Sequence, residues 1–151
     1  MRAMRKQPKG GPALFRLVRF WSRRWANPER PGAPSVHVQV LEAIDAASRR
    51  GPASITTVGE ELGIDRSGAS RMVNTAVEAG YVHKAASNDD ARQVELAPTA
   101  RGNDLLRAAR AWQQSMFERL VADWPAADVN QFARYLERLS DQTVIPEGAR
   151  E

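Results

Sequence analysis

The segment 55–80, ITTVGEELGIDRSGASRMVNTAVEAG, holds the pattern that decides the fold. Thr56 is placed to cap a short helix, because a threonine oxygen can accept a hydrogen bond from a free N–H group at a helix start. Gly63 suits the positive φ that commonly follows a helix. Asp65 can cap a second helix, which is expected to end at Gly80. The segment therefore predicts two helices joined by a three-residue turn.

Apolar side chains in this segment recur every three or four positions, the spacing of one helix face. The first helix is expected to bury Val58 and Leu62, with Ile64 packing beneath it from the turn. The expected buried face of the second helix consists of Ala69, Val73, Ala76 and Val77. Its opposite face is polar and consists of Arg66, Ser67, Ser70, Arg71 and Asn74. In a DNA major groove, arginine pairs with guanine, asparagine pairs with adenine and serine holds phosphate, although a merely solvated helix face has a similar composition.

The residues after Gly80 predict a β-hairpin. Residues 81–86 have strand-like character, and residues 87–90, Ser-Asn-Asp-Asp, favour a turn. Val94 and Leu96 then alternate as a returning strand would. A hairpin that follows a helix-turn-helix is a wing, so the expected fold class is mainly α with a small β-hairpin wing, a winged helix-turn-helix.

Two helices are expected before this segment, separated by a proline-rich loop at residues 27–34. The first has an apolar face spaced at i, i+4, i+7 and i+11, formed by Leu14, Val18, Trp21 and Trp25. The second is capped by Ser35 and ends before Gly51. Its expected inward residues are Val36, Val40, Leu41, Ile44 and Ala47.

Two more helices are expected after the hairpin. A long helix begins at Thr99 and stops at Pro125, with a main apolar stripe of Leu105, Ala109, Trp112, Met116 and Leu120. The last helix carries Val129, Phe132, Leu136 and Leu139 at alternating spacings of three and four. Such a seam favours pairing with another helix.

These elements divide the chain into five parts. They are a flexible basic arm (1–12), N-terminal helices for dimerisation and support (13–50), a winged helix-turn-helix lobe (51–98), C-terminal dimerisation helices (99–142) and a tail (143–151).

Composition excludes several classes of protein. The 151-residue chain has no cysteine, which excludes disulfides, thiolate zinc sites and cysteine nucleophiles. Arg16 and Arg19 interrupt the apolar stretch near the N-terminus, so no membrane span or secretion signal is expected and the protein is expected in the cytoplasm, at the nucleoid. His37 and His83 lie far apart in sequence without a metal-binding pattern, so neither a metal nor a cofactor is expected.

Charge is unevenly distributed. Residues 1–30 contain nine basic residues and one acidic residue, which gives +8, so the net +4 of the chain leaves −4 for the rest. Two interpretations stay open: the basic end contacts an anionic polymer, or it is a solvated arm that supports solubility.

Residues 55–106 resemble the DNA-binding lobe of MarR-family regulators. The stretch 57–67, TVGEELGIDRS, is similar to the first helix and turn of that family, and Ser70-Arg71 is similar to a pair in its recognition helix. Asp90-Ala91-Arg92 matches the Asp-x-Arg signature of the wing, and Thr99 and Gly102 follow at the family's spacing. Gly68 departs from the pattern, because a larger residue is more usual there and glycine costs about 1 kcal/mol of helix propensity.

The resemblance implies a homodimeric transcriptional regulator, expected to be a repressor, that binds double-stranded DNA at a pseudo-palindromic operator. Arg92 is expected in a minor groove, with Asp90 orienting its guanidinium. The candidate DNA-binding residues are Thr56, Arg66, Ser67, Ser70, Arg71, Asn74, Lys84, Asp90 and Arg92.

The terminal helices are expected to form the dimer and to hold a small aromatic effector. The dimerisation candidates are Leu14, Val18, Trp21, Trp25, Val129, Phe132, Leu136 and Leu139. The effector pocket candidates are Trp21, Trp112 and Met116, because aromatic side chains between helices suit a flat ligand. An alternative is a winged-helix module that contacts proteins and does not bind DNA. An enzyme is not expected, because the sequence offers no nucleophile with its base, no phosphate loop and no metal set.

Overall fold

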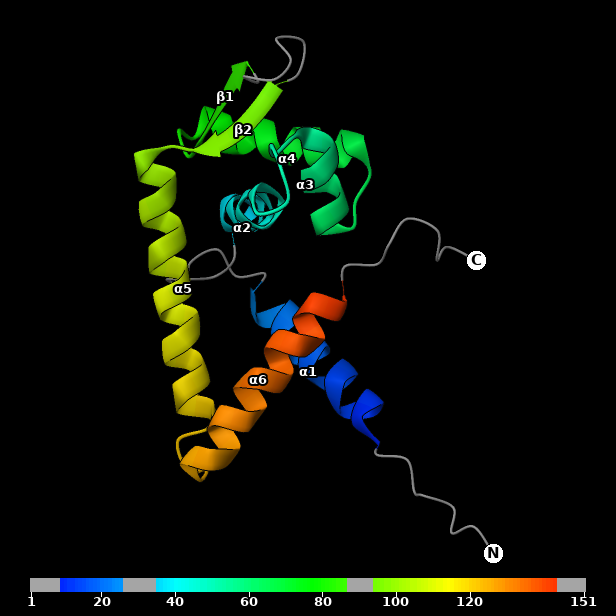
Figure 1. Cartoon of the computed structure of the whole chain (residues 1–151), viewed down its shortest axis with the longest axis vertical. Coiled ribbons are helices and arrows are strands. Elements are labelled where there is room, and N and C mark those ends of the chain that lie inside the picture. The colour runs from blue at the N-terminus through cyan, green and yellow to red at the C-terminus, as the bar shows by residue number, and fades with distance from the viewer. Residues whose placement is uncertain (1–8, 26–34, 87–93, 144–151) are drawn as a thin grey trace, which may run out of the picture.

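A long helix, α5, connects a compact lobe to a pair of peripheral helices (Figure 1). The structure is a computed structural model, and it describes residues 9–25, 35–86 and 94–143. The elements are α1 (Gly10–Trp25), α2 (Val36–Ser48), α3 (Ile55–Leu62), α4 (Arg66–Glu78), β1 (Val82–Ala86), β2 (Val94–Pro98), α5 (Ala100–Leu120) and α6 (Ala126–Gln142). α1 begins at Gly10, inside the segment 1–12 that was expected to be a flexible arm.

The hydrophobic core lies in the lobe, where α2 packs against α3, α4 and α5. Its largest fully buried side chains are Val40, Leu41, Ile44, Val58, Val73 and Leu96. The buried residues of α4 are Ala69, Val73 and Ala76, so the periodicity of segment 55–80 correctly predicted which face of α4 packs inward.

Most of the predicted helix caps are confirmed. Ser35 accepts a hydrogen bond from the Val38 N–H, Asp65 accepts one from the Gly68 N–H at 2.8 Å, and Gly63 has φ 66°. The cap predicted for α3 is wrong by two residues, because Ser54 caps this helix and Thr56 is an exposed residue of its first turn. Ser54 forms a reciprocal capping box with Thr57, which satisfies two backbone N–H groups and so outcompetes a cap at Thr56.

Three apolar residues are more exposed than the sequence indicated. Ile64 is 37% exposed instead of packed beneath α3, and Val36 is 41% exposed while Val38 is buried in its place. Val94 is 49% exposed although Leu96 is buried, because the hairpin extends beyond the core at its outer end. The hairpin is antiparallel and pairs Lys84 with Leu96 and Ala86 with Val94.

The start of α5 is fixed to the end of α4. Thr99 caps α5 and donates a hydrogen bond to the Gly80 carbonyl at 2.6 Å, and Arg101 donates to the Ala79 carbonyl. α5 ends at Leu120, short of the predicted stop at Pro125, which instead begins α6. α5 therefore leaves the lobe in a fixed direction and carries α6 to the opposite end of the molecule (Figure 1).

Candidate nucleic-acid interface

One face of α4 is exposed along its whole length. Arg66, Ser67, Arg71 and Asn74 are exposed and Ser70 is half-buried, while the opposite face packs into the core. The structure thus brings five of the nine candidate DNA-binding residues together on one helix surface. This surface, made of Arg66, Ser67, Ser70, Arg71 and Asn74, is called the α4 polar face below.

The structure explains why position 68, in the first turn of α4, is a glycine. Its N–H donates to Asp65 Oδ1, and a Cβ atom at this position would lie 2.7 Å from that same oxygen. A larger residue would therefore push the capping carboxylate aside. Glycine at this position, although it departs from the family pattern, lets the Asp65 carboxylate lie close to the backbone at the start of the α4 polar face.

Lys84 on β1 lies against the α4 polar face. Its ammonium group donates a hydrogen bond to Asn74 Oδ1 at 2.7 Å, although the two residues are ten positions apart. Lys84 thus joins the five residues of α4 in one cluster. Asp90 and Arg92, the candidates at the tip of the wing, lie outside the described residues.

The basic surface of α1 lies far from the α4 polar face. Arg16 and Arg19 are exposed on α1, which is at the end of the molecule opposite the hairpin and α4 (Figure 1). These arginines cannot contact the groove that the α4 polar face of the same chain would occupy. The positive charge in α1 and the α4 polar face are therefore separate features of the chain.

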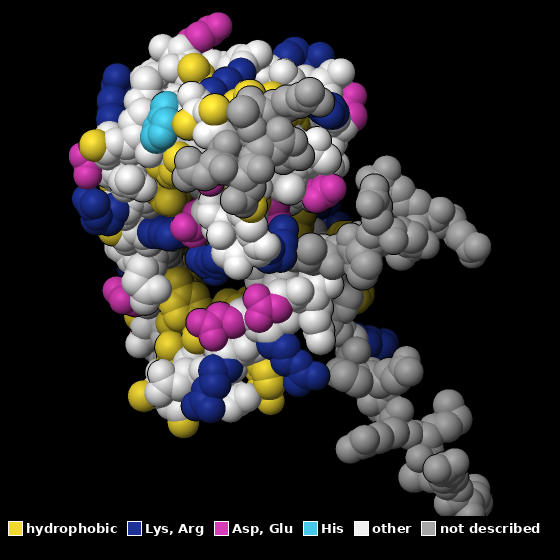
Figure 2. Space-filling model, turned by 45° about the horizontal axis from the view of Figure 1, so that its top comes forward, with side chains coloured by type: hydrophobic (Ala, Val, Ile, Leu, Met, Phe, Trp, Pro, Cys, Tyr) yellow, Lys and Arg dark blue, Asp and Glu magenta, His cyan; other side chains and the backbone are white. Residues whose placement is uncertain are grey.

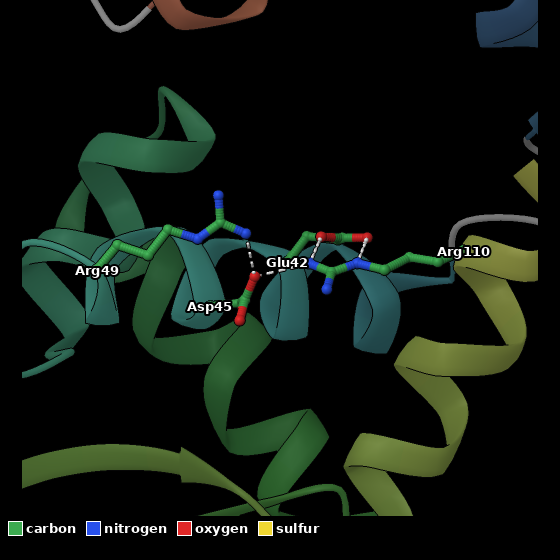
Figure 3. A network of polar contacts seen from close by, with 4 residues as sticks. All are labelled: Glu42, Asp45, Arg49 and Arg110. Atoms are coloured by element: carbon green, nitrogen blue, oxygen red, sulfur yellow. Dashed lines mark hydrogen bonds and ion pairs between the residues drawn. The ribbon is translucent and has the colours of Figure 1, made fainter. Parts of the chain in front are cut away.

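A charged network fixes α5 to α2 (Figure 3). The Arg110 guanidinium donates two hydrogen bonds to Glu42, at 3.2 and 2.6 Å, and a third to Asp45 at 2.7 Å. Arg49 donates to the same oxygen of Asp45 at 2.8 Å. The hydrogen bond from Arg110 lowers the pKa of Asp45 more than burial raises it, and the two carboxylates raise the pKa of Arg110.

Sequence reasoning missed this network. Arg110 is 68 residues from Glu42 and 65 from Asp45, so no local spacing connects them. The only sequence signal was that Glu42 and Asp45 lie three positions apart, which places them on one face of a helix. The network matters for the site because it sets how α5 leaves the lobe that carries α4.

An apolar pocket lies at the other end of α5. It has a volume of about 370 Å³ and is lined by residues of α1, α5 and α6 and of the turn before α6. Trp21, Trp112 and Met116, the three effector candidates, all line it, together with Phe132 and Leu136. Among its described lining residues, Gln113 alone has a polar side chain, apart from the indole N–H groups of the tryptophans. The pocket therefore suits an apolar molecule with few polar groups.

The apolar side chains of α1 and α6 are largely uncovered. None of the residues of α6 is buried, and Leu14, Val18 and Leu139 are each 40% exposed or more. Figure 2 shows hydrophobic side chains exposed in the lower half of the molecule, below the lobe. The side chain of Trp25, another dimerisation candidate, is not described.

The two histidines lie apart and differ in surroundings. His37 is half-buried with its ring 5.0 Å from the ring of Tyr81, and its Nδ1 has no hydrogen-bond partner among the residues that the structure describes. His83 is exposed on β1. Within residues 9–25, 35–86 and 94–143, no three His, Asp or Glu side chains are grouped so as to hold a metal ion. The same residues contain no helix that combines the length and hydropathy needed to cross a membrane.

Residues 32–93, which include the helix-turn-helix and the hairpin turn, match the model of the MarR family. This part of the chain, less than half of its length, is therefore similar to the MarR family. The resemblance seen in the sequence is thereby confirmed. No curated protein is significantly similar to the chain in sequence.

Solved structures of MarR-type regulators share the fold. A mutant of S. aureus MepR superposes with a TM-score of 0.64 at 14% identity, over 87% of this chain and 97% of that one. A MarR/EmrR family transcriptional regulator from Acinetobacter sp. ADP1 gives 0.61 at 17% identity, over 90% and 97%. Streptomyces coelicolor PcaV, in complex with its natural ligand, gives 0.54 at 22%, over 86% and 88%. These matches confirm the predicted winged-helix fold class of this chain.

Proposed function

We propose that this chain is a sequence-specific transcriptional regulator of the MarR type that binds double-stranded DNA as a homodimer. The observation that carries the proposal is the α4 polar face, which is exposed along the second helix of a helix-turn-helix. In that motif the second helix enters the major groove. S. aureus MepR, a structural neighbour, has been solved bound to an oligodeoxyribonucleotide, which supports the proposal.

The proposed DNA contacts come from three elements. Arg66, Ser67, Ser70, Arg71 and Asn74 would face the major groove, and Thr56 on the first turn of α3 would hold phosphate. Lys84 is already in contact with Asn74 at the base of the hairpin. Asp90 and Arg92 complete the set as a proposed minor-groove contact of the wing.

The proposed dimer follows from the uncovered apolar side chains of α1 and α6. Large apolar side chains exposed together on one part of a molecule mark an interaction surface, and a second copy is the partner that our model assigns to it. Two-fold symmetry would give two α4 polar faces, which suit half-sites about 34 Å apart in a pseudo-palindromic operator. Leu14, Val18, Trp21, Trp25, Val129, Phe132, Leu136 and Leu139 remain the proposed dimer residues.

The proposed effector is a small aromatic molecule bound near Trp21, Trp112 and Met116. A volume of about 370 Å³ lies within the usual range of roughly 300 to 1,000 Å³ for small-molecule sites. PcaV was solved with its natural ligand, so a regulator of this fold does bind a ligand. A ligand that changes the spacing of the two α4 helices would lower DNA affinity and relieve repression.

A salt titration of DNA binding tests the central proposal. The purified full-length protein is titrated onto DNA from its own promoter region at several salt concentrations. Because binding releases the counterions of the phosphates, the logarithm of affinity should fall linearly with the logarithm of salt concentration. Arg71→Ala should weaken binding by about 1 to 3 kcal/mol if Arg71 contacts a base.

Arg107→Ala is the matched control, because Arg107 is exposed on α5 and, in the part of the chain that the structure describes, pairs only with Asp104 of its own helix. It should leave DNA affinity unchanged. Equal losses in both variants would point to net charge instead of the α4 polar face. Absence of salt-dependent binding to any fragment of the source genome would favour the alternative, a winged-helix module that contacts proteins.

A further inference from the structure

The hydrogen bond between Lys84 and Asn74 fixes the orientation of an amide on the α4 polar face. The Lys84 Nζ lies 2.7 Å from Asn74 Oδ1. A lysine ammonium only donates hydrogen bonds, so the amide atom that faces it must be the oxygen. The two ends of an asparagine amide are often ambiguous, but this contact resolves them. The Nδ2 group of Asn74 forms no hydrogen bond within the described residues and is left for another acceptor.

The fold brings Lys84 to this position through strand alternation. Val82 and Lys84 are two positions apart on β1 and so point to the same face of the hairpin. Val82 is buried, as is Leu96, the cross-strand partner of Lys84, so this face is directed at the core. α4 packs against β1. Lys84 is the next residue after Val82 on the same face of β1, and its side chain reaches beyond the core to the α4 polar face.

Lys84 and Asn74 together offer DNA a different set of hydrogen-bonding groups from those of a free asparagine. A free asparagine binds adenine with both ends of its amide, because Oδ1 accepts from the adenine N6 amino group while Nδ2 donates to N7. In this chain the Lys84 ammonium lies on Oδ1, and the adenine amino group would meet a cation that is itself a donor. Oδ1 keeps a second lone pair, but a donor placed there would lie beside the Lys84 ammonium, and the other free groups, the Nδ2 amide and the remaining N–H bonds of Nζ, are donors.

Guanine presents two acceptors, O6 and N7, at the corresponding edge of the major groove. We propose that Lys84 and Asn74 act as one unit that selects guanine over adenine at one base pair of each half-site. This inference rests on the proposed function, since it requires the α4 polar face to enter a major groove. It assigns Lys84 a role in specificity, where an isolated lysine would be a phosphate contact, and it replaces adenine as the expected partner of Asn74.

The test begins with selection of bound sequences from a random pool by the full-length protein. The base pair recognised by Asn74 is the position at which Asn74→Ala loses its preference. Affinities of wild type, Lys84→Met and Lys84→Arg are then measured on two duplexes that differ only in having G·C or A·T at that position. Lys9→Met is the matched control, because it removes the same charge from the residue that precedes α1, a helix at the other end of the molecule from α4.

Lys84→Met should lower the preference for guanine over adenine by roughly tenfold, the effect of one good base contact, while Lys84→Arg and Lys9→Met retain it. A uniform loss of affinity on both duplexes, with the preference unchanged, would show that Lys84 only contacts phosphate and would overturn the inference. A wild-type preference for adenine at this position would overturn it as well. If the wild-type protein selects no sequence at all, the proposed function itself fails. Far-UV circular dichroism confirms that each variant is folded.

Discussion

Gly102 shows how one residue can determine the junction between α4 and α5. It is buried in the first turn of α5, directly against the backbone of Tyr81. A Cβ atom at Gly102 would lie 2.1 Å from the Tyr81 carbonyl oxygen, which already accepts a hydrogen bond from the Thr99 N–H. The space is closed by backbone, so no side-chain rotation can relieve the contact.

Gly102→Ala should therefore destabilise the protein by roughly 1 to 3 kcal/mol, the usual cost of overpacking a core. The measurement is the free energy of unfolding from urea titration. Gly11→Ala is the control, because nothing lies within 4 Å of a Cβ at Gly11 and alanine favours a helix over glycine. Equal stabilities for Gly102→Ala and wild type would mean that the helix start shifts freely, contrary to the packing described here.

The residues whose roles the sequence predicted correctly are those that interact with residues close to them in the sequence. Asp65 and Ser35 were identifiable as caps because a cap bonds to the backbone two or three residues on. Thr56 was misplaced because two hydroxyl residues, Ser54 and Thr57, bond to each other reciprocally. Long-range pairs such as Lys84 with Asn74 leave no signal in a single sequence, since they depend on how the hairpin packs on α4.

At the scale of elements, α5 is held to the lobe by Arg110. Its guanidinium bonds two carboxylates on α2, and Trp112, which lines the pocket, follows two positions later on α5. An ion-pair network at this junction is suited to fix the angle between α5 and α2. The sequence predicted both helices, although α5 ends at Leu120 and not at Pro125, but helix periodicity does not encode the angle at which two helices cross.

Arg110→Ala should lower the free energy of unfolding at neutral pH by about 1 kcal/mol or less, because the side chains involved are partly exposed and screened by solvent. The direction in which this stabilisation changes with pH follows from the pKa of Asp45. The pKa of Asp45 is lowered in the folded state by its hydrogen bond from Arg110. The contact therefore stabilises above the ordinary aspartate pKa of about 3.9 and is lost as pH falls through the lowered value.

The difference between wild type and Arg110→Ala should consequently shrink in urea titrations below about pH 4. Arg107→Ala, which removes an exposed pair within α5, should show almost no difference at any pH. A constant difference for Arg110→Ala down to about pH 2 would indicate that packing of the arginine stem, and not its charge, carries the effect.

At the scale of the whole molecule, the lobe has its own hydrophobic core, whereas the end formed by α1 and α6 exposes many of its apolar side chains. Among the side chains that the structure describes, all buried hydrophobic ones except Val121, which follows α5, lie in residues 35–86 and 94–109. The sequence indicated this division, because the seam of α6 at spacings of three and four is narrower than the face of a core helix. The spacing of the seam does not show which surface covers it.

If a second copy covers α1 and α6, light scattering at micromolar concentration should give a mass near twice 16.7 kDa. Leu139→Glu should shift the mass toward the monomer, because it buries a charge in the proposed interface at a cost of several kcal/mol. It should also weaken operator binding, since each half-site would then be bound separately. Val36→Glu is the matched control, because Val36 and Leu139 are equally exposed, at 41%, and Val36 lies on α2 in the lobe. A wild-type mass near 16.7 kDa would contradict the dimer and leave the apolar surface of α1 and α6 to another partner.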